Sequence, residues 1–164
     1  MAHDEEFMAF ASARAAELFR CALLLTGEWY SAEDLVQDTL TTIYRRWSKV
    51  SSAEQPGAYA RRVLLNTFLS GRRRRSSTEV PTATIPAAAA GDDPALRATL
   101  LAGLRSLAPR DRAVVVLRYW MDLDAATTGV LVGCSPEAVR TRARRALGTL
   151  REVLADDFDH LLAD

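Results

Sequence analysis

The clearest pattern of apolar and polar positions lies near the end of the chain, where a helix is predicted over residues 136–151. Ser135 is a good N-cap for this helix, and Pro136 suits its first position. Apolar side chains then recur at helical spacing and form one stripe that we expect to be buried. The stripe consists of Val139, Ala143, Ala146, Leu150 and Val153. Arginines fill a different face, so the helix is amphipathic and basic on its outer side.

A shorter helix is predicted immediately before this one. Its apolar face consists of Leu123, Ala126, Val130 and Leu131. Gly129 lets a second backbone approach closely, and Gly133 is placed to end the helix with a positive φ. Two helices joined by such a tight turn are typical of a DNA-binding helix-turn-helix, whose second helix enters the major groove. The alternative is a helical hairpin whose basic face is merely solvated.

Two helices are expected at the start of the chain. The first covers residues 4–26 and ends at Gly27, and Ser31 opens the second with Asp34 at capping-box spacing. The predicted buried stripe of the second helix consists of Val36, Leu40, Ile43 and Trp47. Its other face carries Asp34, Gln37, Asp38 and Thr41, with Leu35 near the edge. This acidic face is either solvated or a docking surface for a basic partner.

A third long helix is predicted from Pro56, after a loop over residues 48–55. Residues 61–75 of this helix include six arginines and no acid. Alone, these arginines would give only nonspecific attraction to phosphates, or would compensate the C-terminal end of the helix. Because Tyr59 can stack on an unpaired base and Asn66 can hydrogen-bond to one, capture of a single nucleic-acid strand is the more specific interpretation.

Residues 76–94 contain three prolines and many small residues with little periodicity. This composition predicts a flexible linker between two domains, residues 1–75 and residues 95–155. Fully extended, the linker would reach roughly 60 Å. An acidic tail, residues 156–164, follows the second domain.

The composition favours an all-α protein, because strand-like alternation is missing and alanine and leucine are abundant. The formal net charge is zero, but the charges are unevenly distributed. Residues 61–75 and residues 136–151 are basic islands, the second with five arginines and one glutamate, so the rest of the chain is acidic. Such asymmetry suits a protein that contacts DNA at two places and uses acidic surface for another partner.

The candidate chemistry of the chain is sparse. Cys21 and Cys134 are far apart and belong to no CxxC motif, which predicts neither a disulfide nor a zinc site and fits a reducing cytoplasm. No signal peptide, membrane span or membrane partner is expected, because the chain begins with acidic residues and lacks a long apolar run. With no Ser/His/Asp, Cys/His or phosphate-binding glycine motif, we predict no enzymatic activity and no cofactor or metal.

Three stretches resemble motifs of bacterial sigma factors. Residues 32–38, AEDLVQD, resemble the core-polymerase-binding signature, and residues 59–67, YARRVLLNT, are similar to the −10-recognition helix. Residues 107–119, LAPRDRAVVVLRY, look like the start of the region that binds −35 DNA, which ends in the helix-turn-helix. Their order, spacing and total length resemble the extracytoplasmic-function type, most closely the short actinobacterial SigE-like family.

This resemblance implies a dissociable subunit that gives RNA polymerase its promoter specificity, built from two helical domains, sigma region 2 and sigma region 4. The residues implied to contact the clamp coiled coil of core polymerase are Asp34, Leu35, Gln37 and Asp38. The residues implied to form a pocket for a flipped −10 base are Val50, Ser51 and Ser52. The residues implied to line the adjacent strand path are Tyr59, Arg62, Val63 and Asn66. The residues that match −35 reading positions are Arg140, Thr141, Arg144 and Arg145.

The resemblance also implies that the linker threads the polymerase channel and that the second domain touches the polymerase flap, with an anti-sigma protein as a further candidate partner. Glu137 and Ala138 stand where the family usually has Gly-Thr, which predicts a weaker phosphate contact there. Val130 stands where a glutamate is common. Two other functions fit the helices: a stand-alone helix-turn-helix regulator, and a helical adaptor that binds only protein.

Overall fold

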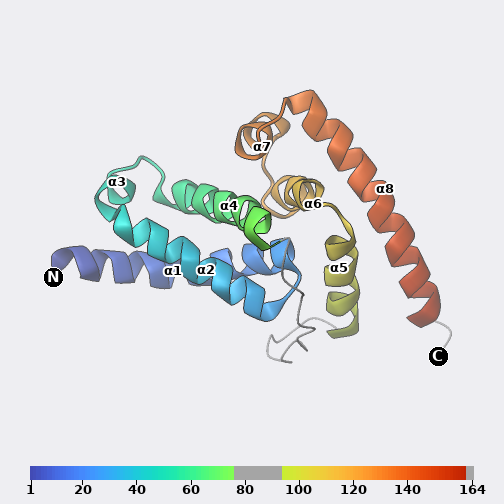
Figure 1. The fold of residues 1–164 in the computed structure, drawn as a ribbon, viewed down its shortest axis with the longest axis horizontal. Coiled ribbons are helices and arrows are strands. Elements are labelled where there is room, and N and C mark those ends of the chain that lie inside the picture. The colour runs from blue at the N-terminus through green and yellow to red at the C-terminus, as the bar shows by residue number, and fades with distance from the viewer. Residues whose placement is uncertain (76–93, 162–164) are drawn as a thin grey trace. The chain divides into compact units, whose positions relative to one another are not determined.

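The computed structural model describes residues 1–75 and 94–161, with side chains placed for residues 1–71 and 94–155. The chain divides into two compact units, residues 1–83 and residues 84–164 (Figure 1). The described residues form helices and no strand, which confirms the predicted all-α class. Apart from Pro94, which begins a helix, the predicted linker lies outside the described residues.

The first unit contains four helices among its described residues: α1 (Ala2–Thr26), α2 (Trp29–Arg45), α3 (Trp47–Ser51) and α4 (Pro56–Arg75). Helices α1 and α2 pack against each other, and α4 packs against both (Figure 1). The largest fully buried side chains of this unit are Leu18, Leu25, Ile43, Leu64, Leu65 and Val50. Burial of these aliphatic groups supplies the main favourable free energy of folding for the unit.

Helix α1 ends as the sequence predicted, but α2 begins earlier than predicted. Gly27 has a φ of 74° and closes α1 with a hydrogen bond from its N–H to the Leu23 carbonyl. The chain re-enters a helix at Trp29, so Ser31 lies inside α2 and its hydroxyl hydrogen-bonds to the Glu28 carboxylate at 3.1 Å. The predicted capping box at Ser31 is therefore wrong: Glu28 occupies the N-cap position, directly after the turn at Gly27.

The buried face of α2 also differs from the predicted stripe. Of the predicted residues, Ile43 is buried, whereas Val36 and Leu40 are half-buried. Thr39 is fully buried, since its hydroxyl donates to the Leu35 carbonyl at 2.7 Å and so carries no unsatisfied polar group into the core. A pattern that counts threonine as polar places the stripe on the wrong residues.

Residues 48–55, predicted as a loop, begin with the last four residues of α3. Trp47, predicted at the end of the second helix, is the first residue of α3 and is buried. The rings of Phe7 and Phe10 pack against the Trp47 ring, with centroids 5.6 and 5.1 Å away. This aromatic cluster anchors the short helix to α1 and explains why the chain does not loop freely there.

The second unit contains α5 (Pro94–Ser106), α6 (Pro109–Val115), a π-helical turn η1 (Val116–Trp120), α7 (Ala125–Val132) and α8 (Pro136–Leu161). Helix α8 runs along the other elements and packs against α5, α6 and α7 (Figure 1). The buried Arg112 donates to the carbonyls of Leu104 and Leu107 at 2.6 and 3.0 Å. These bonds satisfy carbonyls at the C-terminal end of α5 and fix the α5–α6 junction.

Helix α8 confirms its predicted stripe. Its buried residues include Val139, Ala143, Ala146 and Leu150, with Val153 half-buried. The helix continues to Leu161, so the predicted acidic tail begins as part of α8; the side chains there lie outside the described residues.

The predicted apolar face of α7 is wrong at Ala126 and Val130, whereas Leu123 and Leu131 are half-buried. The buried residues of α7 are Ala125, Thr128, Gly129 and Val132, whereas Ala126 is exposed and Val130 is 68% exposed. Asp124 starts the helix, because its carboxylate accepts a hydrogen bond from the Thr127 N–H at 2.6 Å and caps the first turn. This hydrogen bond lowers the pKa of Asp124. Helix α7 is oriented so that Gly129 faces the backbone at Cys134. Ala125 and Val132 therefore point toward the core, and Val130 points toward solvent.

Candidate nucleic-acid interface

The turn between α7 and α8 has the geometry of a helix-turn-helix. Gly133 has a φ of 75° and lets the chain reverse direction at the end of α7. The Ser135 hydroxyl accepts a hydrogen bond from the Ala138 N–H at 3.1 Å, which confirms Ser135 as the N-cap of α8. A Cβ atom at Gly129 would lie 2.5 Å from the Cys134 carbonyl oxygen, so only glycine permits this close approach. Together these contacts fix where α8 begins relative to α7.

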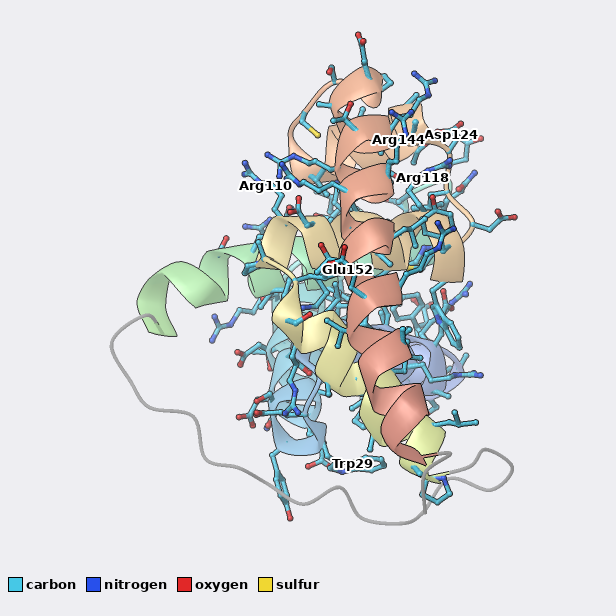
Figure 2. The ribbon with its side chains drawn as sticks, turned by 90° about the vertical axis from the view of Figure 1, so that its right-hand side faces the viewer. Trp29, Arg110, Arg118, Asp124, Arg144 and Glu152 are labelled. Atoms are coloured by element: carbon cyan, nitrogen blue, oxygen red, sulfur yellow. The ribbon has the colours of Figure 1, made fainter. Side chains whose placement is uncertain are left out.

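The four predicted −35 residues lie on the exposed side of α8. Arg140, Thr141, Arg144 and Arg145 are all exposed, while the stripe on the opposite face holds the helix to the unit. In Figure 2, Arg144 lies on the side of α8 where Arg118 and Asp124 are labelled, and Arg110 lies on the other side. An exposed, rigidly mounted row of arginines beside a threonine provides donors for base edges and for phosphates.

Arg145 is held by a carboxylate that the sequence analysis did not single out. Asp111, in the first turn of α6, accepts from Arg145 Nη2 at 3.1 Å and from Arg142 Nη1 at 2.7 Å. The Asp111 side chain is 13% exposed, whereas that of Arg145 is 63% exposed. No local spacing predicts this contact, because Asp111 and Arg142 are 31 residues apart.

A shallow hollow of about 460 Å³ lies at the start of α8. It is lined by Ser135, Glu137, Ala138, Thr141, Arg142 and Arg145. Glu137, the predicted departure from the family pattern, is exposed at this rim. Its carboxylate therefore places a negative charge beside Arg142 and Arg145, which line the same hollow.

The predicted −10 residues fall into an exposed set and a buried set. Arg62 and Asn66 are exposed one helical turn apart on α4, and Tyr59 is half-exposed one turn before Arg62. Val63 is only 9% exposed and Val50 is fully buried, so both belong to the core of the free chain. The structure thus brings Tyr59, Arg62 and Asn66 together but does not open a pocket at Val50.

Ser51 and Ser52, predicted with Val50, lie at the exposed end of α3. The Ser52 hydroxyl donates to the Ser48 carbonyl at 3.0 Å, which orders the start of the loop that leads to α4. These serines face solvent while Val50 faces the core.

Arg61, in the first basic island (residues 61–75), forms an ion pair with Glu17 of the same unit. Its Nη1 donates to Glu17 at 2.8 Å, and Arg14 binds the other oxygen of the same carboxylate at 3.0 Å. Burial by itself would raise the pKa of Glu17, but the hydrogen bonds from Arg61 and Arg14 outweigh it and hold the pKa below its ordinary value. Glu17 is therefore charged at neutral pH and neutralises part of the basic island. The side chains of residues 72–75 lie outside the described residues.

The acidic face of α2 carries three of the four predicted polymerase contacts. Asp34, Gln37 and Asp38 are exposed, whereas Leu35 is 7% exposed and points into the core. The expectation that Leu35 lies at the edge of an exposed face is wrong, because the buried stripe of α2 includes Ala32 and Thr39 on either side of it in the helix.

An open groove of about 840 Å³ runs beside this face between α1 and α2. It is lined by Asp4, Phe7, Met8, Ala15, Phe19, Glu33, Val36, Gln37, Leu40, Thr41 and Tyr44. The contribution of α1 to this groove was not predicted from the sequence. In the structure Met8 is 60% exposed, and an exposed large apolar residue marks an incompletely covered face.

In the part of the chain that the structure describes, no helix has the length and apolar character needed to cross a membrane. The same described residues contain no cluster of His, Cys, Asp or Glu suited to a metal ion. The described geometry therefore centres on surfaces: an acidic face on α2 with an apolar groove beside it, the Tyr59, Arg62 and Asn66 side of α4, and the arginine-rich face of α8.

The chain combines two units: one contains a helix-turn-helix, and the other has Tyr59, Arg62 and Asn66 on one side of α4. This combination is typical of helical DNA-binding proteins built from two modules. Models of two family regions match the chain: Sigma-70 region 2 over residues 11–78 and Sigma-70, region 4 over residues 103–152. An RNA polymerase sigma-E factor of Streptomyces avermitilis is 38% identical over 159 residues, covering 94% of this chain and 89% of that protein. An ECF RNA polymerase sigma factor of Mycobacterium tuberculosis is 29% identical over 189 residues, covering 96% of this chain and 51% of that protein. The chain belongs to the sigma-70 family of RNA polymerase sigma factors and resembles its extracytoplasmic-function members.

The fold agrees with this assignment. The sigma factor RpoE of Bartonella quintana, solved in complex with the anti-sigma factor NepR, matches with a TM-score of 0.76 over 92% of this chain and 98% of that chain. The two sequences are 23% identical, so the match concerns the fold.

Proposed function

We propose that this chain is an alternative sigma subunit that docks on core RNA polymerase through α2 and contacts promoter DNA through α4 and α8. The observation that carries the proposal is the exposed arginine face of α8, rigidly mounted on a helix-turn-helix in a chain that belongs to the sigma-70 family. The stand-alone regulator is not favoured, since the match extends over both regions of a sigma factor.

Docking on the polymerase uses the acidic face of α2. Asp34, Gln37 and Asp38 face solvent together, and the adjoining groove offers apolar surface from Met8 and Leu40. Charged residues at a rim steer a basic partner, whereas apolar groups at the centre provide most of the contact free energy. The partner would be the clamp coiled coil of the polymerase, and Leu35 acts only by supporting the helix from the core.

Recognition of the −10 element uses α4. Tyr59 provides a ring for stacking on an unpaired base, Asn66 provides an amide for its edge, and Arg62 provides a cation for the phosphate. Ser51 and Ser52 would contact a flipped base from the end of α3. Flipping a base costs a few kcal/mol of stacking and pairing, so these contacts must offset that cost.

Recognition of the −35 element uses the exposed face of α8. A bidentate arginine–guanine contact is worth roughly 1–3 kcal/mol of discrimination, and an arginine on phosphate adds affinity without selectivity. Arg140, Arg144 and Arg145 divide these tasks, and Thr141 adds a hydroxyl and a methyl group between them.

The chain would act without bond chemistry of its own and without a cofactor, as a specificity subunit in the cytoplasm, where the polymerase and the chromosome are found. The second unit would also touch the polymerase flap. An anti-sigma protein would act by covering one of the exposed faces described above.

Reconstitution tests the proposal directly. The full chain is mixed with core RNA polymerase from an actinobacterium, the mixture is separated by size exclusion, and transcript starts are mapped on fragmented genomic DNA from the same source. We expect co-elution and a new set of starts that requires the chain. A chain that neither co-elutes with the polymerase nor redirects initiation contradicts the proposal, and sequence-specific binding of duplex DNA by the chain alone supports the stand-alone regulator instead.

A further inference from the structure

Asp111 joins two arginines of the recognition helix to the helix behind it. Its carboxylate oxygens accept separately, Oδ1 from Arg142 at 2.7 Å and Oδ2 from Arg145 at 3.1 Å. Arg142 is the less exposed partner, with 33% of its side chain accessible, against 63% for Arg145. Arg142 therefore anchors the carboxylate on one side, and the fixed carboxylate holds Arg145 on the other.

The contact leaves Arg145 able to bind DNA. A guanidinium has five N–H donors in a rigid fork, and Asp111 engages the group through Nη2. The remaining donors lie on an exposed side chain that adjoins the hollow at the start of α8, next to Thr141. Because the fork is held before DNA arrives, less side-chain entropy is lost on binding than for an arginine that moves freely.

A carboxylate at this position also opposes nonspecific binding. DNA attracts a protein largely through phosphates, and each acidic group near the contact surface reduces that attraction. Asp111 offsets part of the charge of Arg142 and Arg145, so the pair attracts phosphates less strongly than two free arginines would. A fixed geometry and a reduced charge both favour base reading over phosphate binding.

We propose that Asp111 is a specificity-determining positioning residue: it orients Arg145 toward a base edge of the −35 element and lowers the attraction of α8 for noncognate DNA. This inference rests on the proposed function of α8 and goes beyond it, since it assigns base reading to Arg145 and names the residue that makes it selective. Arg142 serves as the anchor of Asp111 rather than as a reader.

The test uses holoenzyme reconstituted with Asp111→Asn, Arg145→Ala, the double variant, and Glu152→Gln as a control. Glu152 is an exposed carboxylate on α8, two helical turns beyond Arg145 and not among the predicted reading residues, and its replacement changes the net charge by the same amount as the Asp111 variant. Run-off transcription from templates with a randomised −35 element, followed by sequencing, gives the base preference at each position. Binding to noncognate duplex across a salt series is measured in parallel.

We expect Arg145→Ala to reduce the preference at one or two positions by at least about fivefold, the lower range for a bidentate arginine contact. Asp111→Asn reduces the preference at the same positions, leaves the others unchanged and binds noncognate DNA at least as tightly as the wild type. The double variant resembles Arg145→Ala, and Glu152→Gln retains every preference. Asp111→Glu keeps the charge but displaces the anchor, so it reduces the same preferences to a smaller extent and serves if Asp111→Asn does not fold.

The inference is overturned if Asp111→Asn retains the wild-type preferences, or if Arg145→Ala retains them. It is also overturned if Asp111→Asn weakens all positions alike together with a lower melting temperature, because a purely structural ion pair behaves in that way. If wild-type holoenzyme shows no −35 preference at all, the proposed function of α8 fails first. These outcomes separate the two proposals.

Discussion

The Cα of Gly129 in α7 faces the carbonyl oxygen of Cys134, so closely that a Cβ at Gly129 would lie 2.5 Å from that oxygen. The Gly129 carbonyl in turn accepts hydrogen bonds from the N–H groups of Gly133 and Cys134 at 2.8 and 3.0 Å. One glycine thus sets the distance between the two helices of the helix-turn-helix. The reading face of α8 depends on this backbone contact as much as on its own arginines.

Replacing Gly129 with alanine should destabilise the second unit. Alanine gains up to about 1 kcal/mol of helix propensity, but overpacking against an unyielding backbone costs about 1–3 kcal/mol and shifts α8. We expect a lower urea midpoint by circular dichroism and loss of −35-dependent transcription. Gly148→Ala is the matched control, because a Cβ at Gly148 meets nothing within 4 Å and should leave stability unchanged or raised. Equal behaviour of the two variants would contradict the assigned contact.

Replacing Glu17 with glutamine should remove a pH-dependent stabilisation of the first unit. Burial opposes ionisation of Glu17, but Arg61 and Arg14 hold its pKa below the ordinary value of 4.5. A lowered pKa in the folded state means that the contribution is present above about pH 4.5 and is lost as the pH falls below it. Because the carboxylate is partly exposed, we expect a loss below about 1 kcal/mol at pH 7.

The difference in melting temperature between wild type and Glu17→Gln, measured by circular dichroism from pH 7 down to pH 3, should shrink as the solution becomes acidic. Glu54→Gln, at an exposed position between α3 and α4, serves as the control. A difference that persists unchanged below pH 4 would show that Glu17 contributes by packing rather than by charge.

The sequence predicted the structure best at positions where the local backbone or capping chemistry of a residue allows only one conformation. Gly27 ends α1 as predicted, Gly133 takes the predicted left-handed conformation, Ser135 caps α8, and the α8 stripe packs inward. In each of these cases local chemistry decides the conformation, so no knowledge of distant contacts is needed. The family resemblance then ordered these elements into two regions.

The sequence was least informative where tertiary packing decided the outcome. Thr39 enters the core because its hydroxyl is satisfied by its own helix, and Leu35 follows it inward, away from the predicted docking face. Val130 turns outward because Gly129 must turn inward. Asp111 meets Arg142 only because α6 packs on α8. The periodicity of the sequence predicts that a helix has an apolar side, but these tertiary contacts decide which residues face the core.

Replacing Gln37 and Asp38 together with alanine should abolish co-elution with core polymerase, since both side chains are exposed on the acidic face of α2. The matched control is Glu54→Ala with Gln55→Ala, which removes one acid and one amide from an exposed loop. Size exclusion with core polymerase provides the measurement. Co-elution equal to wild type would exclude this face as the docking surface.

The buried Leu35 provides a contrast to these exposed residues. Leu35→Ala should lower stability by about 2–5 kcal/mol, the usual range for a leucine truncated in a core. Its melting temperature should therefore fall, whereas Gln37→Ala with Asp38→Ala should melt like the wild type. A stable Leu35→Ala variant that fails to bind polymerase would restore Leu35 to the docking face.

The two cysteines should differ sharply in reactivity. Burial, together with the charge of Glu17, raises the pKa of Cys21 to about 12, so its thiolate is scarce at neutral pH. Cys134 is half-buried at the helix-turn-helix turn. Iodoacetamide at pH 8 should modify Cys134 and spare Cys21 in the folded chain, and should modify both in urea, as read by peptide mass spectrometry. Modification of Cys21 at the rate of Cys134 in the folded chain would contradict the described packing of α1.

Replacing Asn66 with alanine should impair promoter opening more than binding to an opened promoter. The amide is exposed on α4 one turn from Arg62, where it can hold an unpaired base during melting. Loss of one such hydrogen bond predicts a roughly two- to tenfold drop in initiation on duplex promoter. The drop should be smaller on a template with a pre-melted bubble that carries the preferred base, because the cost of unpairing has then been removed. Ser70→Ala, one turn further along α4 and also exposed, should initiate normally on both templates. An equal drop on both templates would show that Asn66 acts only on the strand once it is open, or through folding, and does not assist the melting step.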